Sequence, residues 1–352
     1  MSARLAALLV SLALLVVGCA PHYLPADPPI RTSELAPTHI VTADGYRLPL
    51  RVWPAEGETR AAILALHGFN DYSRAFEEPA AYWSKQGIAT YAYDQRGFGE
   101  TSYRGRWPGI PTLTGDLATA AALIRQAHPD VPLVLIGESM GAAVVMAALV
   151  AKHPPDADAA VLAAPAVWSR ETMPWYQSAG LWLMSHTVPG MSLTASGIER
   201  HPSDNIEMLR DLARDPLVIK KTRVDAIHGL VDLMDAAYAA APRLHGRVLV
   251  LYGRNEDIIP DGAQEAFEAR LPEHGCVRLA HYQQGYHMLF RDLEGETVMA
   301  DVVAWIENPA ASLPSASDAV AAAEAGLPTG TKVAGTSTRH ALSCPRAELA
   351  RP

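Results

Sequence analysis

The residue best placed to do chemistry in this chain is Ser139, which stands between Gly137 and Gly141. An apolar run precedes this Gly-x-Ser-x-Gly motif and a run of small apolar residues follows it, so the pattern predicts a strand, a sharp turn and a helix. Glycine on both sides removes the Cβ atoms that would clash in such a turn, and the helix start directs backbone N–H groups at negative charge. We therefore expect Ser139 to be a nucleophile; the alternative is a serine that only caps the helix.

A serine hydroxyl is a weak nucleophile unless a neighbouring base accepts its proton. We predict that this base is His287, which lies in a loop after the expected strand 276–280. His281 competes for the role, but it falls within or at the end of that strand, whereas catalytic groups concentrate on loops.

The base in turn needs an acid that orients it, and we predict Asp257, just past the expected strand 247–252. Glu256 and Asp261 are the competing carboxylates. Asp261 follows Pro260 at the start of an expected helix, where an acid is favoured by the helix dipole. The chain order is then Ser, Asp, His.

The developing oxyanion requires backbone donors, and two positions suit this task. One is Met140, directly after the serine; the other is Phe69, in the loop His67-Gly68-Phe69-Asn70 that ends an apolar run. We expect His67 to support this loop and not to act as the base.

Four motifs in order resemble the monoacylglycerol lipase and lysophospholipase branch of the α/β-hydrolases, of the serine aminopeptidase S33 type. The resemblance covers roughly residues 38–308, and its motifs are His67–Asp71, Tyr93–Ser102, Gly137–Gly141 and Gly285–His287. It implies an α/β-hydrolase fold, with a mostly parallel sheet of the eight-stranded type, helices on both faces and an inserted helical cap. Ala142 departs from the family pattern, which often has a second glycine there; its methyl group would narrow the site slightly.

The hydrophobic pattern independently predicts strands alternating with helices, which favours a mostly parallel sheet. A β-hairpin is expected around Asp44-Gly45. The expected strands are 61–66, 88–93, 131–136, 159–163, 247–252 and 276–280, and the expected helices are 72–86, 113–128, 140–152, 262–270 and 293–307.

The interval 166–241 is too long for one crossover, so we expect an inserted cap over the active site. Its first half concentrates tryptophan and methionine. We predict that Trp175, Trp182 and Met184 contribute to an acyl-chain groove; the alternative is that such side chains only seat the cap on the core.

The amino terminus has the pattern of a signal peptide, since Arg4 precedes an apolar run, Leu5 to Val17, that is shorter than the ~20 residues needed to span a bilayer. Its end, Val16-Val17-Gly18-Cys19, resembles the lipobox of bacterial lipoproteins, which implies cleavage after residue 18 and lipidation of Cys19. Ala20 at the next position resembles the pattern that sends lipoproteins to the outer membrane, facing the periplasm. Whether Cys276 and Cys344 pair is left open.

The two flanks of the catalytic domain differ from it in composition. Residues 19–37 are rich in proline and predict an unpacked tether between the membrane and the domain. Residues 309–352 lack periodic apolar spacing and predict a disordered tail.

Composition excludes several classes of function. The net charge is -9 and basic residues do not cluster, so nucleic acid is not an expected partner. No phosphate-binding loop, dinucleotide fingerprint or zinc-type cysteine spacing occurs, and we expect neither a cofactor nor a metal.

The favoured hypothesis is a lipid-anchored serine hydrolase that cleaves carboxylic esters of single-chain lipids, either monoacylglycerols or lysophospholipids. A general carboxylesterase is the alternative within the enzymes. The alternative of another class is a non-catalytic envelope lipoprotein that uses the hydrolase fold for binding. The sequence leaves acyl-chain length, headgroup and oligomeric state open.

Overall fold

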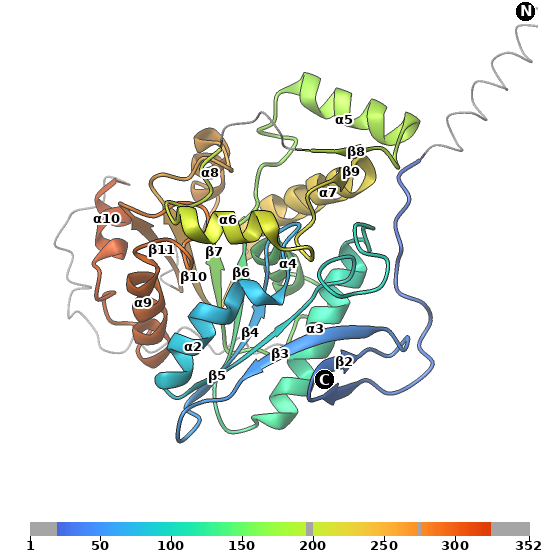
Figure 1. Ribbon diagram of the computed structural model, residues 1–352. Helices are drawn as coiled ribbons and strands as arrows, with labels where there is room; N and C mark the ends of the chain where they lie inside the picture. Colours follow the sequence, from blue (N-terminus) through green and yellow to red (C-terminus); the bar gives the residue numbers. More distant parts are fainter. Residues whose placement is uncertain (1–19, 195–199, 273–275, 325–352) are drawn as a thin grey trace, which may run out of the picture.

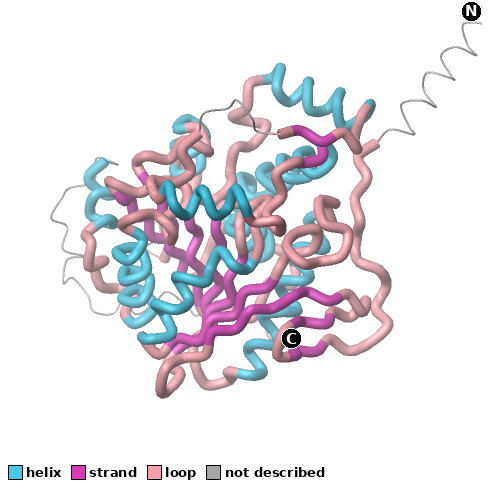
Figure 2. The backbone as a smooth tube through the Cα atoms, in the orientation of Figure 1, coloured by secondary structure: helices cyan, strands magenta, loops and turns pink. Residues whose placement is uncertain are grey.

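The core of the protein is a twisted sheet with helices on both faces (Figures 1 and 2). The computed structural model describes residues 20–194, 200–272 and 276–324. Within them, nine strands form one sheet in the order β1-β2-β3-β5-β4-β6-β7-β10-β11. Their bounds are Glu34–Ala36, His39–Val41, Arg47–Trp53, Ile88–Tyr93, Ala61–Leu66, Leu133–Glu138, Ala159–Ala163, Arg247–Gly253 and Val277–Tyr282.

The six strands from β5 to β11 in this order run parallel, and β1 to β3 add an antiparallel edge. Parallel strands are covered on both faces, which is why their sequences are continuous apolar runs. Each expected strand lies within two residues of an observed one, and the predicted mostly parallel α/β fold is confirmed.

Side chains of successive strand residues alternate between two hydrophobic layers. In β4, Leu64 and Leu66 pack under α3 (Ile110–Ala127), α4 (Met140–Leu149) and α7 (Val224–Ala240), whereas Ile63 packs under α2 (Glu77–Lys85) and α9 (Gly295–Glu307). A short 3-10 helix η1 (Ser73–Phe76) precedes α2, and α8 (Asp261–Glu268) follows β10. The carboxyl ends of the parallel strands meet at one edge of the sheet, and the four sequence motifs lie at this edge.

The cap is the chain between β7 and β10. It contains α5 (Trp175–Thr187), β8 (Ser192–Leu193), α6 (Ile206–Arg214), β9 (Thr222–Arg223), α7 and the short helix η2 (Ala241–Arg243). β8 and β9 pair in a separate antiparallel ribbon. Figure 1 shows α5 at the top of the molecule, farthest from the sheet, and α7 packs on α4 in the body.

Residues 20–33, which we call the strap, are packed against the domain, and this corrects the prediction of an unpacked tether. Backbone N–H groups of Leu24 and Ile30 donate to the carbonyls of Trp107 and Ala43, each at 2.8 Å. The predicted tether also contains β1, which pairs with β2. A proline-rich composition gives no signal for such contacts, because their partners lie far away in the sequence.

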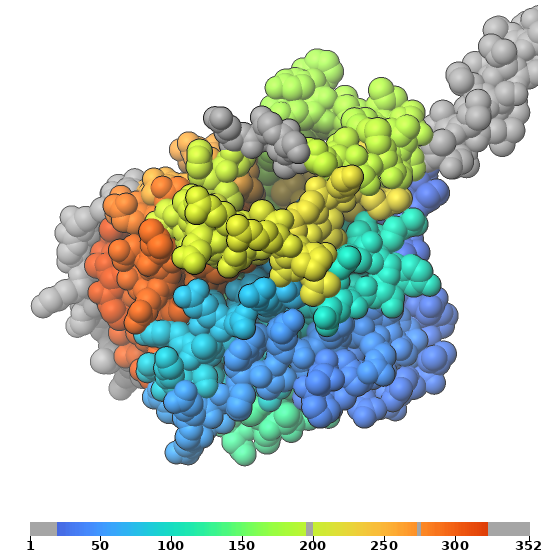
Figure 3. All heavy atoms as spheres, in the orientation of Figure 1, coloured from blue at the N-terminus to red at the C-terminus, as the bar shows by residue number. Residues whose placement is uncertain are grey.

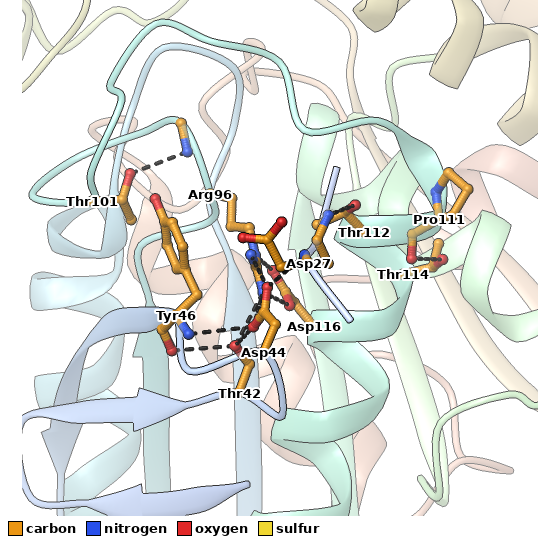
Figure 4. A network of polar contacts seen from close by, with 12 residues as sticks. Asp27, Thr42, Asp44, Tyr46, Arg96, Thr101, Pro111, Thr112, Thr114 and Asp116 are labelled. Carbon is orange, nitrogen blue, oxygen red and sulfur yellow. Dashed lines mark hydrogen bonds and ion pairs between the residues drawn. The ribbon is translucent and has the colours of Figure 1, made fainter. Parts of the chain in front are cut away.

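A buried ion network holds the strap in place (Figure 4). Arg96 binds Asp44 at 2.6 Å and Asp116 at 2.7 Å, with all three side chains almost fully buried. Asp44 also accepts a hydrogen bond from the backbone N–H of Asp27 in the strap, at 3.2 Å. Each charge therefore has a partner, as a buried charge requires.

The described part of the predicted disordered tail is ordered and contains a helix, α10 (Ser317–Glu324). Leu313 is buried, and Arg278 of β11 donates to the carbonyl of Pro309 at 2.7 Å. The hydroxyl of Ser315 donates to Asp301 of α9. The prediction of disorder was wrong for this segment, because polar contacts hold it where apolar periodicity is weak; residues 325–352 lie outside the described residues.

Candidate active site

Ser139 stands at a strained turn between β6 and α4. Its φ of 54° lies in the left-handed region, which a residue with a Cβ atom seldom adopts. A Cβ atom on Gly141 would lie 2.1 Å from the carbonyl oxygen of Leu66, and one on Gly137 would lie 2.4 Å from the nitrogen of Ala142. The two glycines are therefore required by close backbone contacts, as the sequence predicted, and Ala142 is buried in α4.

The loop after β4 lies against this turn. A methyl group added to Gly68 would be 3.5 Å from Cβ of Ser139. Among the described residues, the backbone N–H groups of Phe69 and Met140 donate no hydrogen bond. Both donors are thus available beside the serine, where an oxyanion hole needs them.

His67 holds this loop as a neutral imidazole. Its Nε2 accepts a hydrogen bond from the backbone N–H of Gln95 at 3.0 Å, so its Nδ1 carries the proton and donates to the carbonyl of Gly68 at 2.8 Å. Complete burial lowers the pKa of His67. This arrangement suits a supporting role for His67 and leaves it no part as a base.

His287 lies in the loop after β11 and is 6% exposed. This loop approaches β10 closely, since a Cβ atom on Gly253 would lie 2.2 Å from the carbonyl oxygen of Gly285. The close approach brings the segment after β10 to the imidazole: Nδ1 of His287 lies 2.6 Å from Oε2 of Glu256.

Glu256, and not Asp257, is the carboxylate that contacts His287. Its Oε1 accepts from the backbone N–H groups of Ile258 at 2.7 Å and Ile259 at 3.0 Å, which leaves Oε2 for the imidazole. The loop therefore holds the Glu256 carboxylate against Nδ1 of His287.

Asp257 points instead toward the cap, where Oδ2 accepts from the backbone N–H of His201 at 3.1 Å. Arg200 also donates to the carbonyl oxygen of Asp257 at 2.5 Å. The prediction of Asp257 was wrong by one residue, because the turn that follows Gly253 decides which of two adjacent carboxylates faces inward.

The other competitors occupy structural positions. Asp261 is in the first turn of α8, as expected from its place after Pro260. Nε2 of His281 lies 3.0 Å from Oε1 of Glu268 in α8. Neither residue is a partner of His287.

The protonation of His287 is set by opposing influences. Burial pushes its pKa down, but the charge of Glu256 and the hydrogen bond to it push the pKa up, with a further contribution from Glu138. The net result is a pKa above the ordinary value for histidine. Arg291 opposes this rise.

Three buried charged side chains form a cluster next to the serine turn, and the sequence analysis did not identify them. Arg291 donates to Asp71 at 2.8 Å and to Glu138 at 3.0 Å, and all three are at most 7% exposed. Burial raises the pKa of Glu138, although Arg291 partly offsets the effect. Because Glu138 precedes Ser139 and Asp71 lies in the loop after β4, Arg291 connects both segments to the loop of His287. The only sequence signal was that these polar residues interrupt apolar surroundings.

The predicted acyl-groove residues lie on or near the outer surface of the cap. Trp175 is 80% and Trp182 53% exposed, and Met184 is half-buried. The Trp182 ring stacks on His186 with centroids 4.5 Å apart. The side chains predicted to contribute to an acyl-chain groove are therefore largely open to solvent.

A cavity of about 470 Å³ lies between α2 and α6, and Asp71 and Arg291 contribute to its lining. Its lining is mixed: six of its fourteen residues are acidic, and Ala75, Ala81, Met208 and Leu212 are apolar. In the described part of the chain, no group of histidine, cysteine or acidic residues is arranged to hold a metal. Nor does any helix of that part have the length and apolarity needed to cross a membrane.

The predicted lipidation residue, Cys19, and the apolar run before it lie outside the described residues, as does Cys344. Cys276 is disulfide-bonded.

Comparison with known proteins identifies the family of this chain. Residues 57–294 match the family described as serine aminopeptidase, S33. A monoacylglycerol lipase of Mycolicibacterium smegmatis is 26% identical over 267 residues, which cover 74% of this chain and 93% of the relative. A monoglyceride lipase of Mus musculus is 27% identical over 316 residues, covering 86% and 99%.

Solved structures agree on the fold. A soluble variant of monoglyceride lipase from Saccharomyces cerevisiae, in complex with a substrate analog, superimposes with a TM-score of 0.63 at 20% identity, covering 82% of this chain and 97% of that one. The sheet, the cap and the serine turn described above are the features of an α/β-hydrolase. The chain belongs to the serine aminopeptidase S33 family of α/β-hydrolases.

Proposed function

We propose that this protein hydrolyses carboxylic esters of single-chain lipids, with Ser139 as nucleophile, His287 as base and Glu256 as the orienting acid. At the coarser level the chain is a serine ester hydrolase of the lipase and esterase type. The observation that carries the proposal is the 2.6 Å contact between His287 and Glu256, at the same edge of the sheet as the strained serine turn.

The proposed reaction has two steps. The Oγ atom of Ser139 attacks the ester carbonyl while Nε2 of His287 takes its proton, and the imidazolium then protonates the departing alcohol. Backbone N–H groups of Phe69 and Met140 stabilise the oxyanion. A water molecule, deprotonated by the same imidazole, cleaves the acyl-enzyme and releases the fatty acid.

Glu256 decides which nitrogen acts. A carboxylate at Nδ1 holds the proton there, so Nε2 is the atom with a free lone pair. The same carboxylate stabilises the imidazolium that forms in each step. Aspartate is the usual orienting acid in such triads, and glutamate has the same role in some α/β-hydrolases.

The single-chain lipid substrate is suggested by the names of the two relatives, monoacylglycerol lipase and monoglyceride lipase. The apolar character of the cap supports it, since long acyl chains gain roughly 0.8 kcal/mol for each CH₂ removed from water. A general carboxylesterase would share the chemistry and differ in this preference.

The test combines an active-site probe with graded substrates. Wild type should react with a fluorophosphonate probe and hydrolyse 1-monooleoylglycerol faster than short p-nitrophenyl esters at equal concentration. Ser139→Ala should lose both labelling and turnover by a factor on the order of 10⁵. Turnover of Ser139→Ala at the wild-type rate on every ester would refute the proposal, and equal rates on all chain lengths would favour the general carboxylesterase.

We also propose that Cys19 is lipidated and anchors the enzyme in the bacterial envelope, with the outer membrane facing the periplasm as the expected site. The support is the sequence Val16-Val17-Gly18-Cys19 after an apolar run. In detergent phase partitioning, wild type should enter the detergent phase and a cleaved Cys19→Ser protein the aqueous phase. A wild type in the aqueous phase would refute the anchor and leave the hydrolase untouched.

A further inference from the structure

Trp107 is a buried residue in the loop that joins β5 to α3, and its side chain is 1% exposed. Three separate parts of the chain contact it: the strap, the cap helix α7 and the loop after β4. Figure 3 shows the loop between β5 and α3 in teal, between the blue amino-terminal segment and the yellow part of the cap. The reaction proposed above gives Trp107 no part.

Three aromatic rings connect Trp107 to Phe69. The rings of Trp107 and Phe69 meet edge to face, with centroids 6.2 Å apart. The ring of Phe98 lies against both, and its centroid is 5.7 Å from that of Phe69 and 6.5 Å from that of Trp107. Aromatic rings prefer such edge-to-face contacts, so the packing restricts the direction of the Phe69 side chain.

The backbone N–H of Phe69 needs this support. An oxyanion donor must stay free until the substrate arrives, so it cannot be fixed by a hydrogen bond of its own. The carbonyl groups on either side are held. That of Gly68 accepts from His67 at 2.8 Å, and that of Asn70 accepts from the backbone N–H of Ile219 at 2.9 Å. Phe69 itself is held by the packing of its ring.

Trp107 is in turn held by the strap and the cap. Its carbonyl accepts from the backbone N–H of Leu24 in the strap at 2.8 Å. A Cβ atom on Gly229 of α7 would lie 2.2 Å from Cδ1 of the Trp107 ring, which is closer than two such atoms can come. The indole therefore packs against the backbone of α7 as well as against the Phe69 ring.

Hydrogen bonding does not explain a tryptophan at this position. Among the described residues, Nε1 of Trp107 has no hydrogen-bond partner, although the atom is buried. A buried N–H without a partner lowers stability, and a phenylalanine would fill an apolar position without that cost. The indole differs from a phenylalanine ring in its size, and this size lets one side chain contact both α7 and Phe69.

We propose that Trp107 is a positioning residue for the oxyanion hole, because it packs against the Phe69 ring and thereby holds the Phe69 N–H toward the developing oxyanion. This role rests on the proposed function, in which Phe69 is one of the two donors. Acylation and deacylation both pass through an oxyanion. A misplaced donor should therefore lower kcat whichever step is slower, and leave the binding of the ester, and with it KM, nearly unchanged.

The same substitution at two buried tryptophans tests this role. Trp107→Phe should lower kcat on dissolved p-nitrophenyl butyrate about tenfold, with KM changed less than about twofold, since one of two donors is partly misplaced. The inhibition constant of an alkyl trifluoromethyl ketone, whose hemiketal oxygen occupies the oxyanion hole, should rise by the factor by which kcat/KM falls. Trp305→Phe is the matched control, because Trp305 of α9 is 2% exposed in the other hydrophobic layer and should keep the wild-type kcat.

Three results would overturn the proposal. The first is a kcat of Trp107→Phe within about twofold of wild type, and the second is an equal loss of kcat in Trp305→Phe. The third is a raised KM with an unchanged kcat, because Trp107 would then bind the substrate and not position a donor.

A second variant displaces Trp107 without replacing it. Gly229→Ala places a methyl group against the indole and should lower kcat about threefold or more, again with little change in KM. Gly115→Ala is the matched control, since a Cβ atom on Gly115 of α3 would meet no packed neighbour within 4 Å. A folded Gly229→Ala protein with the wild-type kcat would count against the proposal. Should Gly229→Ala fail to fold, the two tryptophan variants decide alone.

The two proposals fail separately. A wild type that hydrolyses no ester would end the proposed function. An active wild type together with an equally active Trp107→Phe would end the positioning role alone.

Discussion

The loops around the serine and the outer cap are built in opposite ways. Glu256, His287 and Arg291 are each at most 7% exposed and each has a hydrogen-bond partner, whereas only Ser185 of α5 is buried. Groups that transfer protons must be held within a fraction of an ångström, and packing on all sides achieves this. The exposed part of the cap has no proton to transfer and does not need that precision.

The largest effect should come from the acid that contacts His287. Glu256→Gln removes the charge that stabilises the imidazolium and permits the wrong tautomer, so kcat/KM should fall by roughly 10³ to 10⁴. Asp257→Asn is the matched control and should change it less than about threefold, because Asp257 contacts Arg200 and His201 instead. Steady-state kinetics on a short ester decide between them, and the reverse order of losses would restore Asp257.

Loss of the buried cation Arg291 should lower the free energy of unfolding more than loss of an exposed cation. Arg291→Met leaves Asp71 and Glu138 facing each other without a cation, so the free energy of unfolding should fall by about 3–5 kcal/mol. Arg74→Ala removes a cation that is half exposed in its ion pairs and should cost at most about 1 kcal/mol. Urea unfolding measures both losses. Similar losses would show that the buried cluster contributes no more stability than an exposed ion pair.

The pH profile should move with the same acid. His287 acts as a base only when neutral, so activity should fall as pH drops through its pKa, which Glu256 raises. In Glu256→Gln that support is lost and the pKa falls, so the acidic limb of kcat/KM should move to lower pH. Asp257→Asn should keep the wild-type limb; an unmoved limb in Glu256→Gln would mean that another group controls it.

The smallest effect should be at the strap. Tyr23→Phe removes one hydroxyl that binds Asp232 and His228, and a net loss of about 1 kcal/mol in unfolding free energy is expected. Tyr103→Phe is a suitable comparison because Tyr103 is 72% exposed. Equal urea midpoints for both variants would indicate that the strap does not contribute to stability.

The sheet could be predicted well because its strands are long apolar runs between turn residues. The turn at Ser139 could be predicted too, because the Gly-x-Ser-x-Gly spacing between an apolar run and a helix is visible in the sequence, although the contact that requires Gly141 comes from Leu66. The strands and the turn each leave a recognisable pattern within a short stretch of the sequence.

Choosing between Glu256 and Asp257 could not be done this way. A turn from Gly253 to Glu256 orients the two carboxylates, and the groups that receive them, His287, Arg200 and His201, are distant in sequence. The strap posed the same difficulty: composition predicted a free segment, but its partners Trp107, Asp44 and Asp232 come from three separate parts of the chain.

The helix α10 affects whether the edge of the sheet can pair with other chains. β11 is the last strand of the sheet, so one of its sides has no strand partner among the described residues, and α10 packs against β11. An uncovered edge strand offers its backbone groups to any other extended chain and invites aggregation. A chain ending near Asn308 would keep Ser139, Glu256 and His287 and lose this cover, so we expect its first defect to be self-association and not a loss of turnover.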